Sequence, residues 1–294
     1  MITSALTATL ENKPRGLWAD ARRRMFRSPL TLLGFAIVLV MLAFTIAPSL
    51  FAPYDPYKGD LRNWYVKPPV PAHPFGTDDI GRDVLSRVIH GAQISLRVAI
   101  IAEALGVAIG IVLGLITGFY GGWIDSLIMR FVDVFMAFPL LIIAIALIAA
   151  LGPGEVNLFI ALALVIWPFV TRLVRAQVLS LRESEYVNAA RLLGASDLRI
   201  MFAHILPNIL TPLIVFATLG IANTILQEAA LRFLGLGNVD RSTPSWGSML
   251  NDARSYLESA PWMALYPSLA IMLTVIGFNL LGDGLRDALD VRSQ

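Results

Sequence analysis

Cysteine is absent from the 294 residues of this chain, and charged residues are scarce. Without cysteine the chain can form no disulfide, thiolate metal site, thiol nucleophile or cysteine-linked lipid anchor. Asp, Glu, Lys and Arg make up 15% of the residues, against about 25% in an ordinary soluble domain. In contrast, 56% of the residues are hydrophobic, and the mean hydropathy is +0.69. This composition excludes disorder and cannot cover a water-soluble globule, so it indicates an integral membrane protein.

Residues for catalysis or nucleotide binding are also missing. The net charge of +2 is too small for a nucleic-acid partner. A Walker A motif is excluded because no lysine follows a glycine, and the three histidines are too far apart in sequence for a paired zinc site. The chain is therefore predicted not to be an enzyme and to bind no metal or cofactor itself.

Six stretches without a charged residue indicate about six transmembrane helices in an all-α protein. Trimmed at proline, glycine and turn signals, the predicted helices are 30–50, 96–118, 131–151, 157–178, 210–232 and 262–283. The first is expected to be a retained span, because a polar and basic segment precedes it and no cleavage signal follows.

Basic residues before the first span predict its orientation. Residues 1–29 carry six of them and are therefore expected in the cytoplasm. Residues 30–50 then form the first transmembrane helix, and residues 51–95 an extracytoplasmic segment. Residues 96–283 form the transmembrane core with a large cytoplasmic loop at 178–209, and residues 284–294 form a cytoplasmic tail.

The 178–209 loop contains a predicted helix–glycine–helix knob over residues 184–207. Residues 184–193 favour a helix, and Gly194 suits the left-handed backbone at its end. Ser196 is expected to cap a second helix, which Pro207 limits. The knob carries small, apolar and polar candidates for a partner contact. These are Tyr186, Asn188, Ala189, Ala190, Leu193, Ala195 and Leu206.

Proline-rich sequence and a short surface helix are predicted in the 51–95 segment, the helix over residues 83–90. Asp79, Arg82 and Asp83 there, together with Trp246 in a later outer loop, are candidates for docking or for an outer gate. For the charged residues we favour the alternative of helix capping and internal ion pairs.

Polar residues inside the spans are few. Asn223, Gln227 and Glu228 either line a hydrophilic pathway or form hydrogen bonds within the bundle. Glu103 and Asp283 are expected near the membrane interfaces. Glycines every four residues from 106 to 118 are interpreted as a tight helix contact rather than a hinge.

The knob resembles the EAA loop of importer-type ATP-binding-cassette (ABC) permeases. Ala189, Ala190 and Gly194 match that pattern, as does Leu206-Pro207, while Asn188 stands where the pattern has glutamate and His204 where it has isoleucine.

A second resemblance covers about residues 20–288. The run from His73 to Arg87 followed by Gly91–Leu96 is similar to the C-type permeases of dipeptide, oligopeptide and nickel importers. Three later motifs fit in order. They are Gly121–Asp125, Asp133–Pro139 and Pro244–Gly247.

The resemblance implies a type I ABC importer permease in a bacterial cytoplasmic membrane, forming half of a pathway for peptides or a related substrate such as glutathione or a nickel chelate. A second homologous permease, two cytoplasmic subunits that bind ATP and Mg²⁺, an extracytoplasmic binding protein and the lipid bilayer are the implied partners. The alternatives are a stand-alone secondary transporter or channel, which often shows inverted repeats not seen here, and a membrane-embedded enzyme.

Overall fold

The computed structural model describes residue 25, residues 28–237 and residues 242–289. Within these ranges the regular secondary structure is helical, apart from isolated β-bridges in the largely irregular 52–83 segment. Most of the predicted N-terminal segment, residues 238–241 and the last residues of the tail lie outside this part.

The elements are α3 (Pro29–Ile46), α4 (Pro48–Phe51), η1 (Leu61–Asn63), α5 (Val84–Tyr120), α6 (Gly122–Met136), α7 (Leu140–Leu151), α8 (Glu155–Leu181), α9 (Glu185–Leu192), α10 (Asp197–Arg199), η2 (Ile200–Ile205), α11 (Leu206–Phe233), α12 (Trp246–Ala253), η3 (Arg254–Tyr256) and α13 (Trp262–Leu289).

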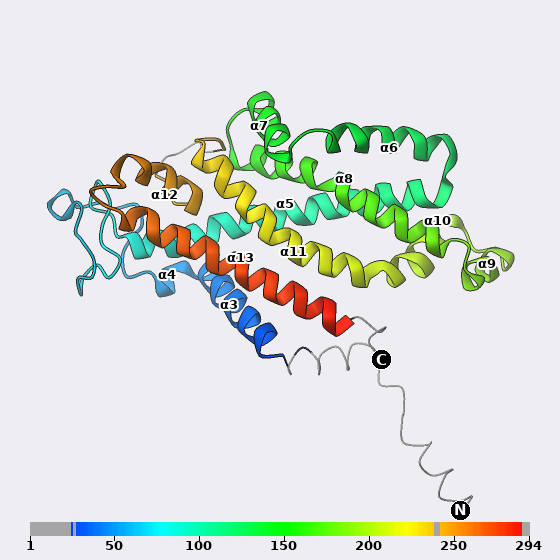
Figure 1. Cartoon of the computed structure of the whole chain (residues 1–294), viewed down its shortest axis with the longest axis horizontal. Helices are drawn as coiled ribbons and strands as arrows, with labels where there is room; N and C mark the ends of the chain where they lie inside the picture. Colours follow the sequence, from blue (N-terminus) through cyan, green and yellow to red (C-terminus); the bar gives the residue numbers. More distant parts are fainter. Residues whose placement is uncertain (1–24, 26–27, 238–241, 290–294) are drawn as a thin grey trace, which may run out of the picture.

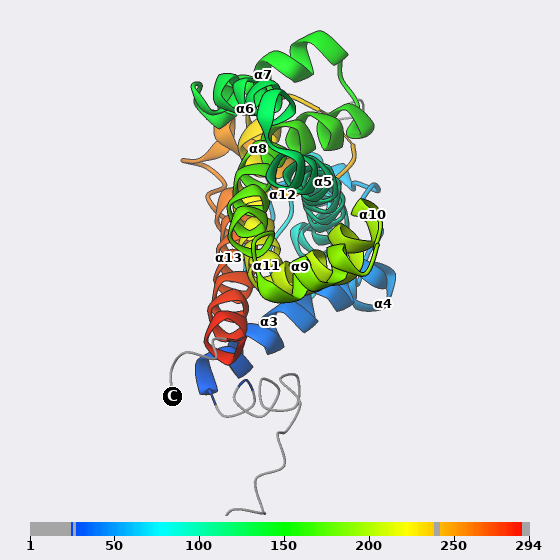
Figure 2. The ribbon, with the colours of Figure 1, turned by 90° about the vertical axis from the view of Figure 1, so that its right-hand side faces the viewer.

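The long helices form an elongated bundle (Figure 1). Helix α5 packs along α8, and α11 packs on α5 and α13, while α3 packs on α13. Viewed along the bundle, α6 and α7 lie on one side and α3 and α13 on the other (Figure 2). Helices α9 and α10 lie at one end, and α12 lies at the opposite end with the 52–83 segment.

Five of the helices are long and apolar enough to cross a membrane, and the bent pair α6–α7 brings the number to six in the described residues. Six spans were predicted, but the single helix over 131–151 is wrong. The chain bends by 98° between α6 and α7. Pro139 causes this break, because it lacks an amide N–H and disfavours helical backbone at Phe138.

Helix α5 begins twelve residues earlier than the predicted start at 96. The predicted surface helix over 83–90 is in fact its first turns. Asp83 caps this start by accepting a hydrogen bond from the backbone N–H of Ser86 at 2.8 Å. Because α5 starts earlier than predicted, Glu103 lies in the middle of this helix and not near its end, and its side chain is 3% exposed. The interfacial position expected for Glu103 is therefore wrong.

The glycine stripe of α5 is a tight helix contact, as predicted. A Cβ atom added at Gly106, Gly110, Gly114 or Gly118 would lie 2.4–2.7 Å from the Cβ of Ile166, Val170, Val174 or Val178 on α8, respectively. The residue numbers on both helices increase by four from one contact to the next. The two helices therefore run in the same direction and keep the same register over these turns. Small residues permit this close approach in a bilayer, where packing contributes more to helix association than the hydrophobic effect.

Gly110→Val should therefore destabilise the bundle by about 1–3 kcal/mol through overpacking against Val170. Ala108→Val is the matched control, because Ala108 is exposed on the same helix. Thermal midpoints of the detergent-solubilised protein should fall for Gly110→Val and change little for the control. Equal midpoints for the two variants would contradict the tight α5–α8 contact.

Candidate functional site

The knob, residues 184–207, is built around a left-handed glycine, as predicted. Helix α9 ends at Leu192, and Gly194 has φ +77°. The Gly194 N–H donates to the carbonyl of Arg191 at 3.0 Å, and the Ala195 N–H donates to the carbonyl of Ala190 at 3.1 Å. This pair of hydrogen bonds is a Schellman motif, which fixes the direction in which the chain leaves α9.

The second half of the knob continues directly into a membrane-crossing helix. The Ser196 hydroxyl caps α10, as predicted, by accepting from the Arg199 N–H at 3.4 Å. Helices α10, η2 and α11 then follow without a break, so the prediction that Pro207 limits this helix is wrong. The π-helical turn η2 widens the backbone immediately before Pro207 and accommodates a ring that would clash in a regular α-helix.

The inner side of the knob packs on the bundle. Val187 and Ala190 on α9 are buried, and so are Ile200, Met201 and Ile205 beyond Gly194. Asn188 is half-buried, and its amide donates to the carbonyl of Glu183 at 3.2 Å and accepts from Arg191 at 3.4 Å. The knob is consequently a rigid extension of α8 and α11.

The outer side of the knob exposes apolar side chains. Leu192 is 89% exposed and Leu193 88%. We call the exposed large apolar residues of the knob the knob face. It consists of Tyr186, Leu192, Leu193, Leu198 and Phe202. Ala189, Ser196 and Pro207 are exposed as well, whereas Ala195 and Leu206 are half-buried. Clustered exposed apolar residues at the end of a bundle are typical of a protein contact. Sequence reading missed Leu192, Leu198 and Phe202, although their apolar character in a loop was a usable signal.

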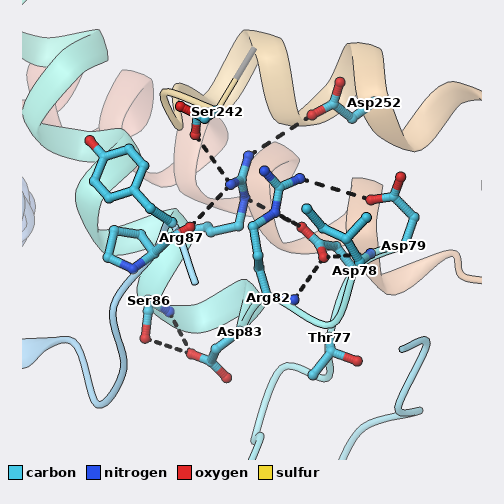
Figure 3. A network of polar contacts seen from close by, with 12 residues as sticks. Thr77, Asp78, Asp79, Arg82, Asp83, Ser86, Arg87, Ser242 and Asp252 are labelled. Atoms are coloured by element: carbon cyan, nitrogen blue, oxygen red, sulfur yellow. Dashed lines mark hydrogen bonds and ion pairs between the residues drawn. The ribbon is translucent and has the colours of Figure 1, made fainter. Parts of the chain in front are cut away.

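At the opposite end, Arg87 is the centre of a buried polar network (Figure 3). Its side chain is 2% exposed. The guanidinium lies 3.6 Å from the carboxylate of Asp78 and 3.9 Å from that of Asp252, and it donates to the carbonyls of Pro56 and Ser242. Burial raises the pKa of Asp252, and the neighbouring Arg87 opposes this shift. Arg87 thus joins α5, α12 and the 52–83 segment.

Three sequence candidates lie in or beside this network. Arg82 forms a 2.6 Å ion pair with Asp78 and lies 3.9 Å from Asp79. Asp83 accepts hydrogen bonds from Ser86 and contacts the ring of His73 at 2.9 Å. In this structure these groups serve helix capping and internal ion pairing.

Trp246 is fully buried on α12. Its indole N–H donates to the carbonyl of Val88 at 3.0 Å, and its backbone N–H donates to Ser95 at 3.3 Å. Gly91 leaves room for the ring, since a Cβ there would lie 2.9 Å from it. These contacts place Trp246 in the packing between α12 and α5.

The middle of the bundle contains a cavity of about 450 Å³. It is lined by Asn223, Thr224 and Gln227 of α11, by Glu103 of α5 and by apolar residues of α7 and α8. Glu228 does not line it. That carboxylate is fully buried and forms an ion pair with Arg232 at 2.5 Å. Of the intramembrane candidates, the structure therefore brings Asn223 and Gln227 together and separates Glu228 from them.

These features define a multi-span helical membrane protein with a rigid knob at one end and, between its helices, a largely apolar cavity that contains four polar side chains. Residues 110–293 match the family described as binding-protein-dependent transport system inner membrane components. Residues 16–69 match the N-terminal transmembrane domain of oligopeptide transport permease C. The chain belongs to this family of transport permeases, and the fold is consistent with its type I ABC importers.

Two relatives are similar along almost their whole length. The chain is 45% identical over 273 residues to the dipeptide transport system permease protein DppC of Alkalihalophilus pseudofirmus, covering 93% of this chain and 89% of the relative. It is 43% identical over 290 residues to the glutathione transport system permease protein GsiD of Escherichia coli O157:H7, covering 98% and 95%. The resemblance to peptide-importer permeases is confirmed.

Replacing Arg87 with methionine should destabilise the protein by about 3–5 kcal/mol, because it leaves Asp78 buried without one of its cationic partners. Arg97→Met is the matched control. Arg97 is 49% exposed and pairs with Glu155, so its loss should cost at most about 1 kcal/mol. Thermal unfolding in detergent measures the loss of stability in both variants. Similar losses in the two variants would show that the Arg87 network is not a structural anchor.

Proposed function

We propose that this chain forms one of the two homologous permease halves of an importer for dipeptides, longer peptides or a related small substrate such as glutathione or a nickel chelate. The names of the dipeptide and glutathione relatives support this substrate class. The observation that carries the proposal is the knob, because it follows α8 after a short turn, continues without a break into α11, and presents an apolar face at the end of the bundle.

In this proposal the energy comes from other subunits. Two cytoplasmic partner subunits bind ATP and Mg²⁺ and move toward each other when ATP is bound. An extracytoplasmic binding protein delivers the substrate. The proposal gives the chain itself no catalytic role, because its sequence has no Walker A motif for binding ATP.

Rigidity allows the knob to act as a lever. A force on the knob face reaches α8 through the buried side of α9, and it reaches α11 through the unbroken helix beyond Gly194. Movement of the ATP-binding subunits would then tilt both helices together. The cavity between α5 and α11 would open alternately to the two sides of the membrane as they tilt.

The orientation follows from this coupling. The knob must lie in the cytoplasm to meet the ATP-binding subunits, which places α12 and the 52–83 segment outside. Helix α13 runs from the α12 end toward the α9 end (Figure 1). Both termini are then cytoplasmic, in agreement with the basic residues that precede the first span.

The absence of native cysteine allows a direct test of the knob contact. Leu193→Cys should crosslink to the ATP-binding subunit in membranes of cells that express the whole importer, because this side chain is fully accessible on the knob face. Ala190→Cys is the control, since Ala190 is turned toward the bundle. Crosslinking of Ala190→Cys but not Leu193→Cys would contradict the proposed contact.

Transport itself provides the second test. Proteoliposomes that contain the complete importer should accumulate dialanine, delivered by the binding protein, only when ATP is present on the side of the ATP-binding subunits. Uptake by this chain alone, driven by an ion gradient, would identify a secondary transporter instead.

In the same assay, Gly194→Val should lower the peptide transported per ATP, because a β-branched residue is strained at φ +77°. Gly194→Asn is the control, since asparagine tolerates left-handed backbone. No atom lies within 4 Å of a Cβ at this position, so steric contact does not complicate the comparison. Normal coupling in Gly194→Val would show that the geometry of the knob is unimportant.

A further inference from the structure

Glu103 lies in the middle of α5 with only part of its hydrogen-bonding capacity used. Its side chain is 3% exposed and lines the central cavity. One carboxylate oxygen, Oε2, accepts a hydrogen bond from the Thr224 hydroxyl at 2.7 Å. The other, Oε1, is buried and has no partner among the described residues. A buried carboxylate oxygen without a partner is costly, so such a position calls for a ligand.

The neighbouring helix is shaped to hold this carboxylate. A Cβ atom at Gly220 of α11 would lie 2.0 Å from Glu103 Oε1. Even an alanine at 220 would therefore push the carboxylate out of its position. Thr224, one turn further along α11, supplies the hydroxyl that orients it. Two positions on one helix face thus fit the same acidic side chain.

A second unpartnered acceptor lines the same cavity. The side-chain oxygen of Gln227 is buried and has no hydrogen-bond partner in the described part of the chain. It follows Gly220 and Asn223 at helical spacing, on the face of α11 that lines the cavity. An acid and an amide side chain therefore line one space, and among the described residues no basic side chain lines it.

The exposed amide of Asn223 indicates that the cavity does not open to lipid alone. Asn223 is exposed on α11 within a membrane-crossing helix. An amide is costly in contact with lipid chains, so it is expected to face a water-filled route or a partner subunit. The volume of about 450 Å³ lies within the range of small-molecule sites, roughly 300–1,000 Å³.

We propose that Glu103, assisted by the side-chain oxygen of Gln227, binds the ammonium group of the substrate as it crosses the membrane. An ammonium group offers N–H donors and no acceptor, which matches two unpartnered oxygens and a negative charge. This inference rests on the proposed peptide-import function and adds a residue-level site to it. It means that the permease, and not only the binding protein, selects peptides with a free amino terminus.

The test measures binding to the complete importer in nanodiscs without the binding protein. Equilibrium dialysis compares radiolabelled dialanine with N-acetyl-dialanine, which lacks the ammonium group. Wild type should prefer dialanine. Glu103→Gln should lower the affinity for dialanine by about ten-fold or more, since a charge-assisted hydrogen bond is lost, and leave the affinity for the acetylated peptide unchanged.

Two further variants separate recognition from damage to the fold. Gly220→Ala should weaken dialanine binding in the same way, because its Cβ displaces Oε1. Glu155→Gln is the matched control, since it makes the same chemical change at a half-buried glutamate outside the cavity, and it should bind like wild type. Glu103→Gln is nearly isosteric and keeps an oxygen for Thr224, so thermal midpoints should stay close to wild type.

Three results would overturn the proposal. They are equal affinity of the wild type for dialanine and N-acetyl-dialanine, an equal effect of Glu103→Gln on the affinity for the two peptides, and no binding of either peptide. Binding of sodium or potassium that excludes dialanine would overturn it as well. Uptake in proteoliposomes distinguishes this outcome from failure of the proposed function. ATP-driven uptake with an unaffected Glu103→Gln variant refutes only the ammonium site, whereas selective binding without ATP-driven uptake refutes only the import function.

Discussion

The close contact between the glycines of α5 and the β-branched side chains of α8 is the interaction on which the rest of the structure depends. Each of the four glycines from 106 to 118 meets one residue of the series from Ile166 to Val178. Backbone atoms come this close only where no Cβ intervenes, so the register of the two helices is fixed over several turns. Because of this contact, α5 and α8 are one mechanical unit.

Different structures are attached to the two ends of this unit. At the start of α5, Arg87 ties the 52–83 segment and α12 to the helix. Beyond the end of α8, Gly194 turns the chain back into α11. A displacement of the knob therefore moves α8 together with α5. Because α11 continues from the knob, the same displacement carries Glu103 of α5 and its partner Thr224 of α11 together, which links the proposed lever to the proposed ammonium site.

Local sequence patterns predicted the parts of this arrangement that depend on neighbouring residues. The spacing of the glycines on α5 and the left-handed position of Gly194 are of this kind, and the structure confirms both. The start of α5 was missed because Arg87 interrupts the apolar pattern and is neutralised by Asp78 from a loop. The place of Glu103 was missed for a similar reason, since its partner Thr224 is 121 residues away in sequence.

Pulsed electron resonance on a doubly spin-labelled chain tests the central claim most directly. Labels at Leu105 on α5 and Leu192 on the knob, both exposed, report the distance within one chain of the complete importer. A matching pair of labels, one at Leu192 of each permease half, reports the movement between the halves. The account predicts that trapping with ATP changes the second distance and leaves the first unchanged. A change in the first distance on ATP binding, with the second constant, would contradict it.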